Sequence, residues 1–338
     1  MLAKFFEALY PKVLINIVVK RTLTLVYIEL CSKKGTTHSI HEEFETTTLN
    51  DKMLDFIQHY IKESPYYYIS ILDRNFIQGV IPSCRKQELN YYHDLSDCEY
   101  KCYDNSWAYY TARSELYETE KIYKDIGVDF IFSPFIVLTT FFKDKIEGKL
   151  AIYVLIEDAY LSLAVFENNK LLYGEHLDME NVAELDDVLL SSEIDDDEEL
   201  DLDEGIDLES MDVEDDGIEL EDFGDIEDLD SIEDIDEFDS KDVEEELLES
   251  EDVLEEPQEE GFNEDYQRFS LIQDSIAKYY KDERYESQFL ENMYIADGVG
   301  VSRELKKYLE EEMFLNVYIR HIEIDAEVCE LTKEELGL

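Results

Sequence analysis

The alternation of apolar and polar positions predicts an α/β protein. Its first half contains strands that precede and alternate with helices. The strands are expected at Val13–Val19, Leu23–Cys31, His38–Glu45, Tyr66–Leu72, Phe76–Ile81, Trp107–Ala112 and Val128–Phe132. Helices are expected after the cap residue Asn50, at Arg113–Ile126 with a stop at Gly127, and from Ser133–Pro134 onward. The polar stretch between residues 83 and 105 is expected to be irregular.

The second half repeats this order. Strands are expected at Leu150–Glu157, Leu161–Phe166, Lys170–His176, Asn292–Ala296 and Asn316–Ile319, with a tight hairpin turn at Asn168–Asn169. One helix carries Phe269, Ile272, Ile276 and Tyr279 on a single face, and another begins after Ser302. Three strands, a helix, a strand, a helix and a strand therefore occur twice.

This duplicated βββαβαβ order predicts the ribonuclease-H-like duplication found in actin and the sugar kinases. The first lobe is expected to span residues 1–148. The second lobe is expected to begin with a β-meander at residues 149–183 and to resume at residues 261–338. Between these two parts, residues 184–260 form an insertion.

The insertion changes the picture through its charge. The chain has 86 acidic and 29 basic residues, and the insertion contains 41 of the acidic residues but only one of the basic residues. It therefore carries −40 of the formal net charge of −57. Such self-repulsion predicts a disordered segment, because its scattered Leu and Ile residues could not bury enough apolar surface alone. The alternative is an acidic-hydrophobic segment that folds on a basic partner.

The composition of the rest of the chain argues against membrane-spanning, secreted and nucleic-acid-binding proteins. No stretch approaches the ~20 apolar residues of a membrane span, and residues 1–12 do not resemble a signal peptide. The negative charge argues against binding nucleic acid, which needs clustered Lys and Arg. Five scattered cysteines are typical of reduced thiols in a cytosolic compartment. We therefore expect a cytoplasmic protein.

Several motifs resemble a known family of actin-like proteins in bacterial envelope machines: PilM of type IV pilus assembly and the cytoplasmic part of GspL from type II secretion. Ile152–His176 is similar to that family's second phosphate hairpin, and Glu291–Leu309 to its adenosine motif. Gly127–Val137 is similar to its segment linking the lobes. The family carries an inserted subdomain after the third strand of the second lobe, which is where the acidic insertion lies.

The resemblance implies a nucleotide pocket, and each of its motifs departs from the family pattern. The implied pocket residues are Asn16, Lys20, Glu157, Asp158, Asp297, Gly298 and Gly300. Asn16 and Val18 stand where Asp-x-Gly is expected, and Asp297 replaces a glycine. Because phosphate needs close backbone approach and tolerates no facing carboxylate, we expect a scaffold without a cofactor. The alternative is an ATPase or kinase that uses ATP and Mg²⁺.

The resemblance also implies partners. A non-catalytic scaffold of a pilus, type II secretion or DNA-uptake platform would bind the cytoplasmic tail of an inner-membrane protein in the groove between lobes. It would also contact a secretion or pilus ATPase, and would lie at the inner membrane through its partner. An acidic adaptor or chaperone acting through the insertion is a second alternative.

One further group could bind metal. Cys84, His93, Cys98 and Cys102 lie in one polar stretch, and thiolates with imidazole can hold a tetrahedral Zn²⁺. The Cys98-x₃-Cys102 spacing is looser than a zinc knuckle, so reduced thiols without metal are the alternative.

Overall fold

The computed structural model describes residues 10–32, 35–179 and 259–338. The predicted acidic insertion lies outside the described residues, apart from its last two positions, which begin a helix. Among the described helices, none is long and apolar enough to cross a membrane.

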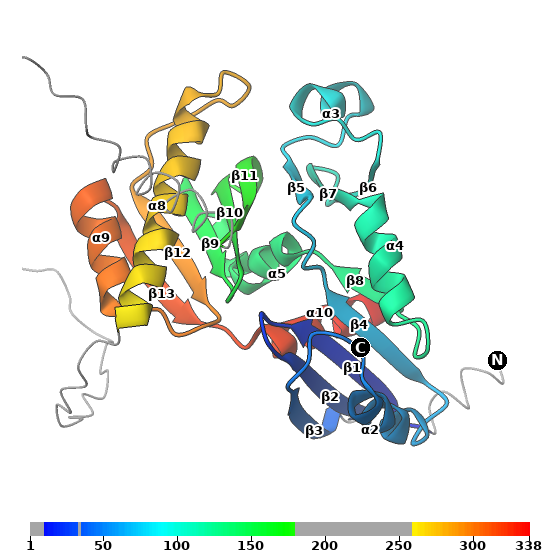
Figure 1. The fold of residues 1–338 in the computed structure, drawn as a ribbon. Coiled ribbons are helices and arrows are strands. Elements are labelled where there is room, and N and C mark those ends of the chain that lie inside the picture. Colours follow the sequence, from blue (N-terminus) through cyan, green and yellow to red (C-terminus); the bar gives the residue numbers. More distant parts are fainter. Residues whose placement is uncertain (1–9, 33–34, 180–258) are drawn as a thin grey trace, which may run out of the picture. The chain divides into compact units, whose positions relative to one another are not determined.

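The first lobe is built on a five-stranded sheet of order β3-β2-β1-β4-β8 (Figure 1). Its strands are β1 (Lys12–Val19), β2 (Thr24–Ser32), β3 (Gly35–Phe44), β4 (Tyr67–Leu72) and β8 (Phe130–Phe132). The first three pair antiparallel, whereas β4 is parallel to both β1 and β8. Besides α3 (Lys86–Tyr92), which belongs to the small sheet described below, the described helices of this half are α2 (Asp51–Ile61), α4 (Arg113–Ile122), α5 (Pro134–Phe141) and α6 (Lys143–Ile146).

The second lobe repeats the topology as β11-β10-β9-β12-β13. Its strands are β9 (Ala151–Ile156), β10 (Tyr160–Glu167), β11 (Lys170–Asp178), β12 (Asn292–Asp297) and β13 (Asn316–His321). Its helices are α8 (Glu259–Lys281), α9 (Arg303–Met313) and α10 (Ile324–Leu336). The two sheets have the same strand order and the same combination of parallel and antiparallel pairs. This duplicated arrangement is the actin-like fold, so the predicted fold class is confirmed.

Local chemistry fixes the element boundaries that the sequence predicted. Asn50 accepts a 2.9 Å hydrogen bond from the backbone N–H of Met53, which caps α2. Ser133 and Ser302 cap α5 and α9 in the same way. Asn168 and Asn169 both adopt positive φ, as a tight turn between β10 and β11 requires.

Each sheet is covered by its own helices on one face and by an exchanged helix on the other. Met53 and Ile57 of α2 pack on Val13, Ile15 and Ile17 of β1. On the second sheet, α8 and α9 fill the corresponding place. The helices that cover the opposite faces are exchanged between the lobes. Helix α10, from the second half of the chain, packs on β1, β2 and β4 of the first sheet, and α5, from the first half, packs on β9 and β10 of the second sheet. The helix α10 was not predicted.

A small third sheet of order β5-β7-β6 branches from the first lobe. It consists of β5 (Gln78–Ile81), β6 (Cys98–Tyr103) and β7 (Trp107–Ala112), with α3 (Lys86–Tyr92) beside it (Figure 1). Leu89 of α3 and Ala108 of β7 share a small core with Ile81 and Cys98. The prediction of an irregular stretch between residues 83 and 105 is therefore wrong, because α3 and β6 bury apolar residues there.

Candidate functional site

Loops after the central strands of both lobes meet at the position predicted for the nucleotide. Lys20 and Arg21 follow β1, Glu157 and Asp158 follow β9, and Gly298 follows β12, which ends at Asp297. Three of the predicted pocket residues, Asp158, Asp297 and Gly300, lie around or beneath a cavity of about 410 Å³ together with Arg21. This region is named the interlobe cleft below.

Asn16 does not belong to the interlobe cleft. It lies within β1 with its side chain fully buried, and its Nδ2 donates to the carbonyl of Tyr27 at 3.1 Å. Its Oδ1 accepts a 3.2 Å hydrogen bond from Thr332 of α10. Because α10 covers this face of the sheet, the structure does not bring Asn16 together with the other residues of the implied pocket.

The backbone N–H groups of the turn after β12 donate hydrogen bonds to carboxylate side chains of the protein itself. Asp297 Oδ1 accepts from the N–H groups of Val299 (3.0 Å) and Gly300 (2.8 Å), and Oδ2 accepts from Val301 (2.9 Å). The next donor, the N–H of Ser302 at the start of α9, is 2.9 Å from Asp265 Oδ2. Converging N–H groups of this kind usually bind anions such as phosphate. In this turn the carboxylates of Asp297 and Asp265 accept the hydrogen bonds of these N–H groups instead.

The two glycines of this turn are required for different reasons. A Cβ on Gly298 would lie 2.6 Å from Cδ1 of Ile324 and 2.9 Å from the carbonyl oxygen of Ile156. Gly298 is thus a packing position between β9 and α10. Gly300 has open space around it, but its φ of +83° lies in the left-handed region that favours glycine.

Arg21 closes the interlobe cleft from the first lobe. Its backbone N–H and its guanidinium both donate to Asp158, and Nη1 lies 3.2 Å from Glu264 Oε1 on α8. On the opposite wall, Arg268 pairs with Glu264 at 2.7 Å and with Asp265 at 2.6 Å. Lys20 contributes its backbone: its carbonyl accepts a 2.8 Å hydrogen bond from Arg74 Nη1. Side chains of the protein therefore bridge the place where a nucleotide would join the lobes.

Two carboxyl groups are buried beneath this bridge. Burial raises the pKa of Glu157 to about 8, although the positive charge of Arg74 lowers it in part and Asp158 and Asp73 raise it further. Burial likewise raises the pKa of Asp73, after β4, to about 6, against a hydrogen bond from the N–H of Asn75 at 3.0 Å. Glu157 is therefore mostly protonated at neutral pH, a poor state for a Mg²⁺ ligand.

A buried polar group connects the small sheet to the second lobe. His176 Nδ1 lies 2.9 Å from Ser162 Oγ, and its Nε2 lies 3.4 Å from Gln78 Nε2. Burial lowers the pKa of His176 to about 3, so its imidazole is neutral. The pairing of His176 with Gln78 could not be predicted from the spacing of residues, because Gln78 is 98 positions away.

The structure does not bring the proposed zinc ligands together. Cys84 and Cys102 form a disulfide, Cys98 is buried in the core of the small sheet, and His93 stacks on Tyr110 with ring centroids 4.3 Å apart. The expectation of reduced thiols is wrong for Cys84 and Cys102, because Cys84, which follows β5, and Cys102, which lies in β6, have their Cα atoms only 5.7 Å apart. Among the residues that the structure describes, no three His, Cys, Asp or Glu side chains gather as a metal site would.

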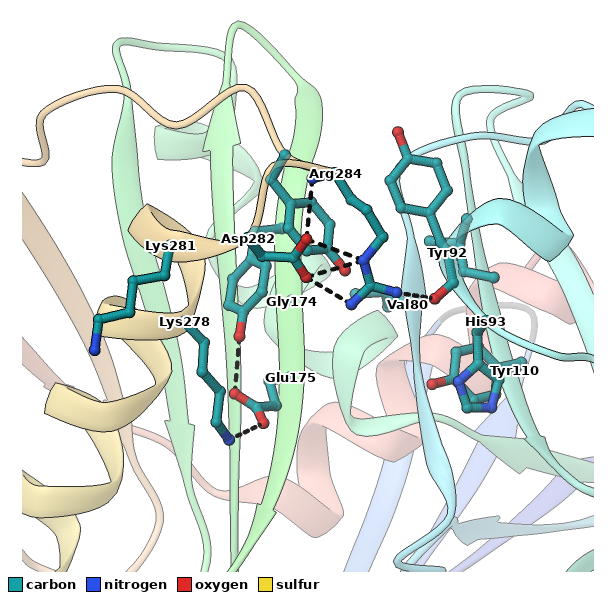
Figure 2. Close-up of a pocket in the computed structure, with 13 residues that line it drawn as sticks. Val80, Tyr92, His93, Tyr110, Gly174, Glu175, Lys278, Lys281, Asp282 and Arg284 are labelled. Carbon is teal, nitrogen blue, oxygen red and sulfur yellow. Dashed lines mark hydrogen bonds and ion pairs between the residues drawn. The ribbon is translucent and has the colours of Figure 1, made fainter.

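A second, larger hollow lies away from the interlobe cleft, between the small sheet and the second lobe (Figure 2). A cavity of about 490 Å³ is lined by Val80, Tyr92 and Tyr110 on one side and by Gly174, Glu175 and Tyr285 on the other. A neighbouring cavity of about 580 Å³ shares Tyr92, Arg284 and Tyr285 with it. These two cavities are together named the seam groove. Sequence reasoning identified none of its residues except His93 and Cys84.

Two family models match the chain, one over each half. A family model described as a domain of unknown function (DUF8341) matches residues 152–337, and another domain of unknown function (DUF8569) matches residues 10–139. No curated protein matches the chain.

Solved structures with likeness to the chain are remote. A protein of Bacteroides thetaiotaomicron with actin-like ATPase fold and unknown function is 12% identical, with 96% of this chain and 98% of that chain covered and a TM-score of 0.49. The PilM-PilN type IV pilus biogenesis complex is 10% identical, with 93% and 89% covered and a TM-score of 0.45. MreB 5 of Spiroplasma citri bound to AMPPNP is 10% identical, with 96% and 97% covered and a TM-score of 0.44.

Proposed function

The chain belongs to the DUF8341 family, and we propose that it is a non-catalytic actin-like scaffold of an envelope assembly platform. In this proposal the protein serves a type IV pilus, type II secretion or DNA-uptake machine. It binds the cytoplasmic tail of an inner-membrane protein and is held at the membrane through that partner.

The observation that carries the non-catalytic part is the occupied turn after β12. Asp297 and Asp265 satisfy the four N–H groups that a phosphate or a ribose would otherwise approach. A nucleotide would have to displace a carboxylate and also break the contacts of Arg21 with Asp158. Both steps cost binding energy, and both oppose an ATPase.

Isothermal titration calorimetry tests this part. ATP and ADP, each with and without Mg²⁺, are expected to show no binding tighter than ~100 µM, which corresponds to about 5 kcal/mol. Tighter, Mg²⁺-dependent binding would support the alternative of an actin-fold ATPase or kinase and would overturn the scaffold proposal.

Two observations support a basic, membrane-anchored partner. The chain carries a formal charge of −57, which attracts cationic segments over long range. Cytoplasmic tails next to a membrane span are enriched in Lys and Arg. The motifs at Ile152–His176 and Glu291–Leu309, which resemble the PilM and GspL family, point to the same class of partner.

Membrane recruitment tests the partner. Purified protein is incubated with inverted inner-membrane vesicles from the source cells, and with the same vesicles after protease has trimmed their exposed tails. We expect sedimentation with the intact vesicles only. Equal binding to trimmed vesicles would indicate lipid instead of a protein tail, and a chain lacking residues 184–256 that loses all binding would favour the acidic adaptor.

A further inference from the structure

A further cavity, of about 270 Å³, lies where α4, the small sheet and the first sheet meet (Figure 1). Strand β7 contributes Tyr109 and Thr111 to its lining, α4 contributes Leu116 and Glu120, and β8 contributes Ile131. The cavity shares no lining residue with the interlobe cleft. It is named the α4 pocket below.

A buried carboxyl group lines the α4 pocket. Asp73 follows β4, and only 4% of its surface is exposed. Its Oδ1 accepts a 3.0 Å hydrogen bond from the N–H of Asn75, and a carboxylate has lone pairs for further donors. In the part of the chain that the structure describes, no cationic side chain pairs with Asp73, and the negative charge of Glu115 on α4 acts on it instead. A cation in the pocket would therefore relieve a costly burial.

The other charges around the pocket also favour a cation as its occupant. Two of the charged lining residues already form ion pairs: Glu99 with Arg113 at 2.8 Å, and Lys101 with Glu335 at 3.4 Å. Glu120 adds a further carboxylate at an exposed position of α4. The lining thus holds three acidic residues and one basic residue, and the basic one is engaged elsewhere.

The uncharged lining indicates which kind of cation fits. Leu116 and Ile131 offer apolar contacts, and burial raises the pKa of Tyr109 to about 12, so its ring stays neutral. Metal ions such as Ca²⁺ and Mg²⁺ need several oxygen ligands, and no three His, Cys, Asp or Glu side chains gather within the described residues. An organic cation instead combines a charge for the carboxylate with carbon for aliphatic and aromatic walls.

We propose that the α4 pocket binds a small alkylammonium ion, whose charged group pairs with Asp73 and whose alkyl chain packs on Leu116 and Ile131. This site goes beyond the proposed scaffold function and does not depend on it. A primary ammonium suits the site because its three N–H groups can donate to the carboxylate and to neighbouring oxygens such as the hydroxyl of Thr111.

NMR titration of the full chain tests the site, with the δ1 methyl group of Ile131 as a local probe. The ligand is n-butylammonium and n-butanol is its uncharged counterpart, in about 0.15 M salt to screen the general attraction of the acidic chain. We expect a saturable shift at pH 7 with a Kd on the order of 1 mM, and binding of butanol at least tenfold weaker. Asp73 has a pKa of about 6, so at pH 5 it is mostly protonated and ammonium binding should weaken about tenfold.

Two pairs of variants complete the test. Asp73→Asn should weaken ammonium binding at least tenfold and remove its pH dependence, whereas Asp125→Asn, the same change at an exposed position, should alter it less than twofold. Leu116→Trp should fill the pocket and abolish the shift, whereas Tyr117→Trp, on the exposed face of α4, should preserve it. Equal binding of butanol, equal effects within either pair, or pH-independent binding to the wild type would overturn the site.

Discussion

The hydroxyl of Thr332 in α10 lies 3.2 Å from Oδ1 of Asn16 in β1, which is 316 positions earlier in the chain. The same hydroxyl is 2.6 Å from Ser70 Oγ in β4. All three side chains are fully buried. A polar cluster of this kind must be satisfied internally, so it fixes the register of α10 against the first sheet.

Replacing Thr332 with valine should therefore destabilise the protein. The change keeps the shape but leaves Asn16 and Ser70 without a shared partner, at a cost of about 1–3 kcal/mol in the free energy of unfolding. Urea denaturation followed by circular dichroism measures it. Thr332→Ser keeps the hydroxyl and should cost only the lost methyl group, ~1 kcal/mol. A valine variant as stable as the serine variant would contradict the role of the cluster.

Asp297→Asn should destabilise the turn after β12. Asparagine keeps one oxygen, but it loses the charge and at least one of the three N–H contacts with Val299, Gly300 and Val301. We expect a loss of about 1–3 kcal/mol and faster amide exchange at residues 299–301. Hydrogen exchange measures the second effect directly. Unchanged exchange at these amides would mean that the carboxylate does not hold the turn.

The two glycines of this turn should respond differently to alanine. At Gly298 the new Cβ meets Ile156 and Ile324 at impossible distances, so we expect a loss of about 2–4 kcal/mol. At Gly300 there is room, and only the left-handed backbone opposes alanine, at roughly 1 kcal/mol. Thermal unfolding of both variants checks the order. A larger loss at Gly300 would contradict this assignment of causes.

Glu157 should make stability depend on pH. Its pKa rises from 4.5 in the unfolded chain to about 8 in the folded protein, so folding takes up a proton between these values. This contribution is present below about pH 4.5 and is lost as pH rises through 8. Glu157→Gln should therefore match the wild type near pH 5 and exceed it at pH 9 by at least ~2 kcal/mol. Urea unfolding across this range, with Glu311→Gln as a surface control, measures the difference. Parallel pH profiles for wild type and Glu157→Gln would contradict it.

The sequence predicted most of the fold because the relevant signals are local. Alternating apolar residues marked the strands, and Asn50, Ser133 and Ser302 marked helix starts. Helix α10 was missed although Ile324, Val328 and Leu331 follow helical spacing and Gly337 ends it. In the same way, Leu89 and Cys98 are buried within a stretch whose overall polarity concealed α3 and β6.

The site could be predicted only in part. Asp158, Asp297 and Gly300 do lie at the interlobe cleft, because strand ends of this topology meet there. The partners that fill it, such as Arg21 and Asp265, come from distant segments and leave no mark in local spacing. The burial of Asn16 depends on a distant segment in the same way, because no residue near β1 in the sequence indicates that α10 will cover it.

The exchange of helices between the repeats also governs how the chain can fold as it is made. The face of the first sheet that carries Leu14 and Asn16 is covered by α10, whose residues are synthesised some three hundred positions later. During translation this face stays open to water and to other chains, since α5, the helix that follows the first sheet, packs on the second. The first lobe thus cannot be completed on the ribosome by its own residues, and chaperone contact should persist until α10 emerges.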